Sequence, residues 1–492
     1  MKKFFGVIAL AAILFGQVSP AFADDGEMMA MLESMKQQMT KMQNTIDSQS
    51  DRIQELESRR TREVSTPSSA ATSSSPTMSD ADFQKSLKDN VGQALPWLKG
   101  LKQSGDFRLR YEGFNYYDHD MDNTTATPDR ARNRFRVRLR WGLEKEIGDD
   151  WKVGFRLATS PDAAAAGQPT DNTSTNQTLG DYFNFKSFNV DKAYAQYTPN
   201  GLKDYGMIKG VTIGAGKFDN PFLRYSTPIT WDGDVTPEGA YEKVALGLIS
   251  AEENKLNFYG TAGQFVINEG TAMDRDTFMM GYQGAFNWNT YSFGTERPVD
   301  ASIALSYYDY IDYASTVQPA ANNTAATSYL RTNTFALTEP AILDFYPEVI
   351  VYAWDQPLTL WYNYVKNVGA FNNDIINTNP AHSDDTAWGL GFKYGKLKTK
   401  GTWELFYGYY EIGSNAVVAA FSDSDFGGPG GNGYTNRIGQ KFGVGYQLTD
   451  AISVNWTGYV VAPLAPVAAT IAGVASADEK VFRSQLDAVY KF

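Results

Sequence analysis

The chain has 492 residues, no cysteine, two histidines and a formal net charge of −12. The missing cysteines exclude disulfides, thiolate metal sites, iron–sulfur clusters and c-type haem attachment. Both histidines, His119 and His382, fall in predicted loops, so we expect no catalytic residue, no metal site, no cofactor and no enzyme. The acidic balance also argues against nucleic acid as a partner.

The N-terminal segment, residues 1–23, has the organisation of a secretory signal peptide. Two lysines form a charged start, residues 4–15 form an apolar core, and Ala21-Phe22-Ala23 is an A-x-A cleavage site. The apolar core is too short to be a membrane-spanning helix. We therefore expect the mature protein to begin at Asp24 and to be exported.

A heptad pattern predicts a coiled coil in residues 24–60. Apolar residues recur there at alternating steps of four and three, which is the spacing of positions a and d. Position a holds Leu32, Met39, Ile46 and Ile53, and position d holds Met28, Met35, Met42, Gln49 and Leu56. Such a helix cannot bury its seam alone, so the pattern predicts self-association. A single amphipathic helix lying on another surface is the alternative.

Residues 61–104 are predicted to be a linker. The stretch 61–79 is rich in Ser, Thr and Ala and contains two prolines, which is typical of a flexible tether. We expect a short amphipathic helix after it, with Phe83, Leu87 and Val91 on one side. Pro96 ends this helix.

The most informative stretch is a column of alternate arginines. Six of them occupy every second position, namely Arg130, Arg132, Arg134, Arg136, Arg138 and Arg140. The residues between them become apolar, from Phe135 to Trp141. A period of two predicts a β-strand with one charged face and one apolar face. Lipid on one side and water on the other fits this strand best; a soluble amphipathic strand and a disordered basic arm are the alternatives.

The same period recurs from residue 105 to residue 492, which predicts an all-β fold. No segment after residue 23 is a good spanning helix, and a closed antiparallel β-barrel is the other way to cross a membrane. Short and long connections alternate, as in bacterial outer-membrane barrels. The segment count predicts sixteen strands, the first at Asp106–Tyr117. The chain ends in Tyr490-Lys491-Phe492, which resembles the terminal assembly signal of such barrels.

The cost of arginine in lipid predicts which way the column faces. One outward arginine at the bilayer midplane costs ~2–4 kcal/mol, and six would approach the ~5–15 kcal/mol that stabilises a whole domain. We therefore expect the column to line the lumen, together with Arg108, Arg110 and Arg156. The loop expected at residues 219–240 can supply counter-charges. Its four acidic residues are Asp219, Asp232, Asp234 and Glu238.

At this point the chain resembles the trimeric, sixteen-stranded outer-membrane porins of Gram-negative bacteria, and is similar to the phosphate-selective and general diffusion types. The motifs that carry the resemblance are R-N-R-F-R-V-R-L-R-W (132–141), G-F-R-L-A-T (154–159), T-S-T-N-Q-T-L-G (173–180), D-K-A-Y (191–194), G-K-F-D-N-P-F (216–222) and W-D-G-D-V-T-P-E-G (231–239). In porins the loop after strand five folds into the barrel and forms the constriction. The resemblance implies that Asp232, Asp234 and Glu238 face the arginines there.

Three functional hypotheses follow. The first is a passive channel for small hydrophilic solutes, with anions favoured by the arginines. The second is a porin specific for phosphate, another oxyanion or a sugar. A sugar track needs aromatic side chains in the lumen; Tyr116 and Tyr194 are candidates, although we expect most aromatics on lipid-facing surfaces. The third is a structural tether, in which the coiled coil reaches periplasmic partners or the cell wall.

The expected partners follow from the first hypothesis. They are outer-membrane lipid and lipopolysaccharide, small anionic or neutral solutes, and copies of the same chain in a homotrimer held by barrel and coiled coil. The expected location is the bacterial outer membrane, with the coiled coil in the periplasm.

Overall fold

The structure of the chain is a computed structural model. It describes residues 100–116, 132–160, 172–180, 182–223, 227, 229–269, 276–291, 297–313, 337–371, 385–426, 435–464 and 480–492. The predicted signal peptide and coiled coil, most of the predicted linker, both histidines and Arg130 lie outside these residues.

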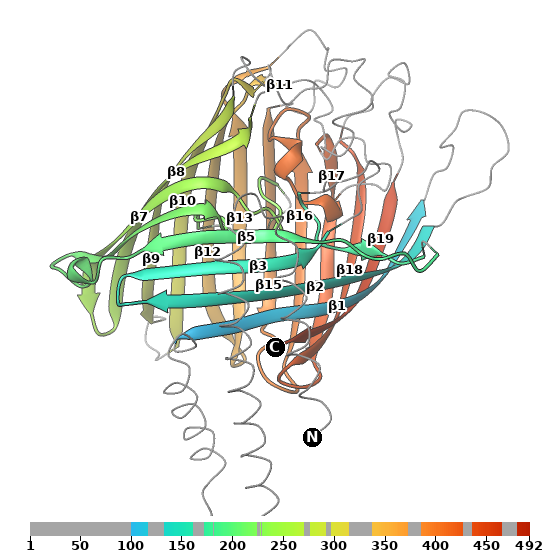
Figure 1. Cartoon of the computed structure of the whole chain (residues 1–492). Coiled ribbons are helices and arrows are strands. Elements are labelled where there is room, and N and C mark those ends of the chain that lie inside the picture. The colour runs from blue at the N-terminus through green and yellow to red at the C-terminus, as the bar shows by residue number, and fades with distance from the viewer. Residues whose placement is uncertain are drawn as a thin grey trace, which may run out of the picture. The chain divides into compact units, whose positions relative to one another are not determined.

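The described part of the chain forms a closed antiparallel β-barrel of sixteen strands (Figure 1). In chain order the strands are β1 (Leu101–Tyr116), β2 (Arg132–Ile147), β3 (Trp151–Thr159), β5 (Phe188–Tyr197), β6 (Ile208–Lys217), β7 (Glu238–Ala251), β8 (Asn254–Asn268), β9 (Thr277–Tyr291), β10 (Pro298–Ile311), β12 (Ala341–Ala353), β13 (Gln356–Asn367), β15 (Thr386–Gly395), β16 (Trp403–Ile412), β17 (Arg437–Gln447), β18 (Ile452–Pro463) and β19 (Val481–Lys491). Each strand pairs with the next, and β19 pairs with β1 to close the ring. The predicted fold and strand number are confirmed.

A few short elements lie outside this ring. The two-residue strand β4 (Gln177–Thr178) pairs with β2, and β11 (Leu337–Glu339) pairs with β14 (Ala370–Phe371). Three single turns of 3₁₀ helix are η2 (Asn200–Leu202), η3 (Ala419–Phe421) and η4 (Ser424–Phe426). Within the described ranges, no helix has the length and apolar character needed to span a membrane.

Short and long connections alternate around the barrel, as predicted. Residues 148–150, 252–253, 354–355 and 448–451 connect strands at one end, which we call the short-turn end. The segments 160–187, 218–237 and 413–436 connect strands at the other, which we call the long-loop end. In bacterial barrels the short turns face the periplasm. The first strand begins at Leu101, inside the segment predicted to be linker.

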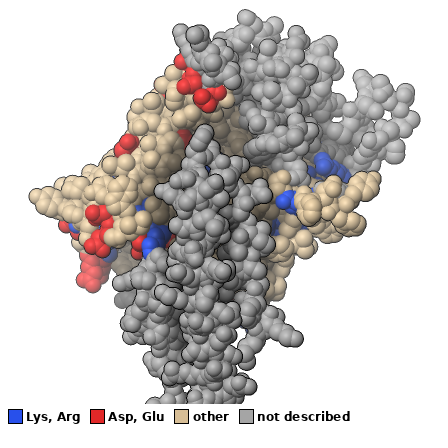
Figure 2. All heavy atoms as spheres, viewed as in Figure 1, with Lys and Arg blue, Asp and Glu red and all other residues tan. Residues whose placement is uncertain are grey.

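The two faces of the wall strands differ sharply in exposure. On β2, Phe135 is 55% exposed and Arg136 is 6% exposed. On β1, Tyr111 is 42% exposed and its neighbour Glu112 is fully buried. The exposed apolar side chains therefore form the lipid-facing surface, and the charged side chains of β1 and β2 point into the barrel. Figure 2 agrees, because much of the visible described surface carries no charged side chain.

Candidate functional site

Three segments from the long-loop end fold into the barrel interior: residues 172–178, 218–237 and 414–426. The middle one reaches across the lumen. Its Thr230 hydroxyl donates to the Asp344 carboxylate on β12 at 2.8 Å, while its Asp234 accepts a hydrogen bond from Arg140 on β2. Because β2 and β12 lie on opposite sides of the ring, the segment 218–237 crosses the barrel interior.

Two glycines allow this segment to leave the wall. Gly216 and Gly239 are paired across β6 and β7, and their φ angles are +117° and +141°. A Cβ atom on Gly216 would lie 2.3 Å from the Ala193 carbonyl oxygen on β5, and one on Gly239 would lie 2.1 Å from the Gln264 carbonyl oxygen on β8. Both the backbone angle and the available space therefore require glycine at the base of the loop.

The segment 414–426 folds inward as well, which sequence reasoning missed. The backbone N–H of Asp232 donates to the Phe421 carbonyl at 2.6 Å, and the Ser424 N–H donates to the Asp232 carboxylate at 3.0 Å. The Trp231 ring stacks on Phe421 with centroids 5.4 Å apart. The two inward segments thus pack as one unit, with an apolar core rich in aromatic rings.

Most of the predicted arginines are paired with a carboxylate. The pairs are Arg134 with Glu112, Arg138 with Asp106 at 2.6 Å, Arg140 with Asp234, and Arg156 with Asp191. Arg110 binds Asp487 on β19 at 2.7 Å and Asp425 of the segment 414–426 at 3.1 Å. The arginine column is therefore one half of a lattice of opposite charges. Arg132, at the start of β2, is exposed.

Sequence reasoning missed a further arginine, Arg483 on β19. It pairs with Glu112 and, at 2.6 Å, with Asp425. A usable signal was present, because Arg483, Gln485 and Asp487 alternate on one face of the terminal strand. Barrel closure places this strand next to β1, and Arg110 lies directly opposite Asp487 in the register.

Two of the buried arginines lack a close carboxylate partner. The nearest carboxylate oxygen is 3.8 Å from Arg108, on Asp487, and 3.9 Å from Arg136, on Glu112. Their Nε atoms are buried and make no hydrogen bond. In the register of β1 and β2, Arg108 stands opposite Arg138 and Arg110 opposite Arg136. Since like charges at directly opposite positions repel, Arg108 and Arg136 are the least compensated of these cations.

The four predicted loop acids divide into two groups. Asp232 and Asp234 lie in the barrel interior, as described above. Asp219 instead pairs with Lys192 of β5. Glu238 is not in the loop at all; it is the first residue of β7 and pairs with Lys217 at 2.7 Å. The structure thus does not bring Asp219 or Glu238 to the arginines.

The loop carboxylates differ in how burial and charge set their pKa. Burial raises the pKa of Asp232, and the neighbouring Asp423 and Asp234 carboxylates raise it further. Burial also opposes ionisation of Asp234 and Asp425. For Asp234 the guanidiniums of Arg140, Arg138 and Arg108 outweigh burial, and for Asp425 those of Arg483 and Arg110 do so; both pKa values are lowered. Asp234 and Asp425 are therefore held ionised, whereas Asp232 is harder to ionise than an ordinary aspartate.

A cavity of about 530 Å³ lies in the barrel among these groups. Its basic lining residues are Arg108, Arg110, Arg138, Lys393 and Lys441, and its acidic ones are Asp232, Asp234, Glu348, Glu404, Asp423, Asp425 and Asp487. Aromatic rings complete the wall. Trp361 stacks on Tyr410 and on Tyr346, with centroids 5.5 and 6.4 Å away. The lumen thus has aromatic side chains. Tyr194, one predicted contributor, donates a hydrogen bond to Glu144.

With this geometry established, we compared the chain with known proteins. The family model described as "Putative porin" matches residues 117–341 and 351–462, which together exceed half of the chain. The chain belongs to this porin family. A comparison with curated proteins found no match.

Solved structures similar to this porin include three outer-membrane proteins. OprB of Pseudomonas putida is 13% identical, with a TM-score of 0.47, and the match covers 86% of this chain and all of that one. An anion-selective porin from Comamonas acidovorans is 11% identical, with a TM-score of 0.40 and coverage of 80% and 99%. The outer-membrane channel DcaP of Acinetobacter baumannii is 14% identical, with a TM-score of 0.37 and coverage of 80% and 97%.

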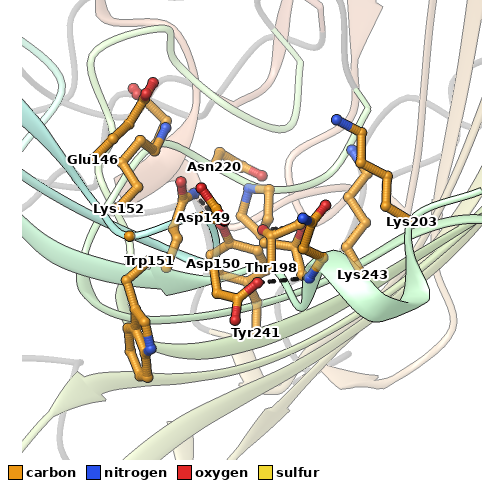
Figure 3. A pocket seen from close by; sticks show the side chains of 16 residues that line it. Glu146, Asp149, Asp150, Trp151, Lys152, Thr198, Lys203, Asn220, Tyr241 and Lys243 are labelled. Carbon is orange, nitrogen blue, oxygen red and sulfur yellow. Dashed lines mark hydrogen bonds between the residues drawn. The ribbon is translucent and has the colours of Figure 1, made fainter. Parts of the chain in front are cut away.

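The porin has a second hollow, of about 720 Å³, against β3, β5, β6 and β7 (Figure 3). Three of these strands, β3, β5 and β6, are short. The hollow is therefore lined both by residues of the short turns and by Asn220 of the segment 218–237. Figure 3 shows Lys203 and Lys243 on one side and Lys152 near Glu146 on the other. The hollow is predominantly polar, as expected for a water-filled part of a channel.

Proposed function

We propose that this outer-membrane porin is a water-filled channel for small hydrophilic solutes that favours anions, and that Arg108 and Arg136 are the source of the preference. The observation that carries the proposal is that these two buried arginines lack a close carboxylate, whereas Arg110, Arg134, Arg138 and Arg140 form ion pairs. A paired charge has a weak field at a distance. An uncompensated one attracts a passing anion.

The expected size of the effect follows from Coulomb's law. A unit charge ~7 Å from a permeating ion in a water-filled lumen contributes ~0.6 kcal/mol, of opposite sign for chloride and for potassium, which is about a threefold change for each ion and roughly an eightfold change in their permeability ratio. Loss of either arginine should therefore reduce the preference without abolishing conductance. The loop acid Asp234 bears on the preference less, because it is paired with Arg140.

The test is the reversal potential in planar bilayers under a potassium chloride gradient. We expect the wild type to favour chloride. Arg108→Gln and Arg136→Gln should each lower the chloride-to-potassium permeability ratio about eightfold. Arg297→Gln is the matched control, because Arg297 is an exposed residue near the short-turn end. An unselective wild-type channel would overturn the proposal. So would a chloride-to-potassium permeability ratio that stays at the wild-type value in both variants.

The heptad pattern supports a second proposal, that residues 24–60 join copies of the porin into a homotrimer. Deletion of residues 24–79 tests it. If the coiled coil is needed for assembly, the deleted protein should run as a monomer by size-exclusion chromatography with light scattering. A trimer of unchanged stability would assign the segment to tethering instead.

A further inference from the structure

Three aromatic rings form a row on the wall of the 530 Å³ cavity. Trp361 of β13 stacks on Tyr346 of β12 with an interplanar angle of 12°, and on Tyr410 of β16 with an angle of 22°. All three residues line the cavity. We propose that this row binds small neutral sugars, whose pyranose ring stacks on Trp361. The inference rests on the proposed function, because it names a solute class that the same channel interior recognises.

Glycines on β15 allow the rings to lie along the wall. A Cβ atom on Gly391, the register partner of Trp361, would lie 2.5 Å from the Trp361 ring, and one on Gly389 would lie 2.5 Å from the Tyr410 ring. The Tyr410 ring is buried and packs against Phe426 with centroids 5.2 Å apart. Trp361 is partly exposed. The aromatic surface available to a solute is therefore chiefly that of Trp361.

Polar side chains surround Trp361 at distances that the register fixes. Glu348 of β12 stands directly opposite it and accepts a hydrogen bond from the Tyr346 hydroxyl at 3.4 Å. Thr359 lies two residues along β13 on the same face, and Lys393 of β15 is its register partner. Directly opposite Cβ atoms are ~5 Å apart, and residues two apart on a strand are ~7 Å apart. One sugar ring on Trp361 can therefore place hydroxyl groups near all three polar residues.

The chemistry of these groups favours a sugar. An aromatic ring has a negative face, against which the slightly positive C–H groups of a pyranose ring pack. The sugar hydroxyls both donate and accept, so they can bind the Lys393 ammonium, the Thr359 hydroxyl and the Glu348 carboxyl group at once. An aromatic carboxylate could also stack on Trp361, but at Glu348 it would meet a second acceptor. A polyhydroxylated neutral solute therefore fits this surface better.

Glucose and sorbitol test the inference, because they have nearly the same mass but only glucose forms a pyranose ring. The single-channel current of the full-length porin is titrated with each solute. We expect the concentration that halves the current to be about tenfold lower for glucose, or ~1.4 kcal/mol. Trp361→Leu should remove this difference. Trp361→Phe, which keeps a flat ring, should retain part of it, and Lys393→Met, which removes a donor, should reduce it about threefold.

The control variant is Trp288→Leu, because Trp288 is 46% exposed on the lipid-facing surface and should not affect either titration. If Trp361→Leu forms no conducting channel, Lys393→Met carries the test, since Lys393 is exposed. Equal blockade by glucose and sorbitol in the wild type would overturn the sugar inference, as would blockade by benzoate but not by glucose. Either result together with chloride preference leaves the channel proposal intact. Absence of conductance in the wild type would refute the proposed channel and this inference with it.

Discussion

Replacement of Glu112 by Gln tests the charge lattice most directly. Glu112 is fully buried and pairs with Arg134 and Arg483; the Arg483 Nε donates to it at 2.9 Å and Gln485 at 3.0 Å. The variant keeps the shape of the side chain and removes its charge. It therefore leaves two buried guanidiniums without their shared anion.

The magnitude follows from the distances. At ~4 Å and an effective dielectric constant of ~20, one pair of unit charges is worth ~4 kcal/mol. Breaking a buried ion pair by removal of one partner costs ~3–5 kcal/mol. We expect Glu112→Gln to lower the free energy of unfolding by that amount, measured by denaturant titration in detergent micelles with tryptophan fluorescence.

A matched control lies on the neighbouring strand. Glu146 pairs with Lys102 at 2.5 Å, but their side chains are 54% and 64% exposed. Solvent screens an exposed pair, which therefore contributes little to stability, so Glu146→Gln should have little effect. The double variant Glu112→Gln/Arg483→Gln should be less destabilised than the sum of the two single variants, because the residues are coupled. If Glu112→Gln costs no more than Glu146→Gln, the lattice does not stabilise the barrel.

Two further predictions concern the inward segments. Because the pKa of Asp232 is raised in the folded state, docking of the segment should be strongest in acid and should weaken as pH rises through that pKa. Current noise in single channels of the wild type should then increase with pH. Asp232→Asn should remove this pH dependence. If the pH dependence persists in the variant, a group other than Asp232 causes it. Trp231→Ala removes the contacts of the indole ring with Phe421 and Tyr308. We expect the free energy of unfolding to fall by ~3–5 kcal/mol as a result. Single-channel conductance should rise as the segment undocks, and unchanged conductance would contradict the docking role.

The wall of the barrel could be predicted from local patterns. Strands in a lipid-facing wall alternate between apolar and polar side chains with a period of two, so Phe135 and Arg136 reveal their faces without knowledge of their neighbours. The alternation of short and long connections is likewise visible in the amino-acid sequence alone. Neither property depends on which distant segment finally lies nearby, and for that reason the strand number was predicted correctly.

The partners of the charged groups were decided by tertiary structure. Arg110 and Asp487 are 377 positions apart and meet only because the ring closes. Asp425 reaches Arg110 and Arg483 because the segment 414–426 packs on Trp231 inside the lumen. Composition and period show that arginines face water, since an unpaired charge in lipid is too costly. Only the packed interior shows which of the buried arginines, Arg108 and Arg136, lack a close carboxylate.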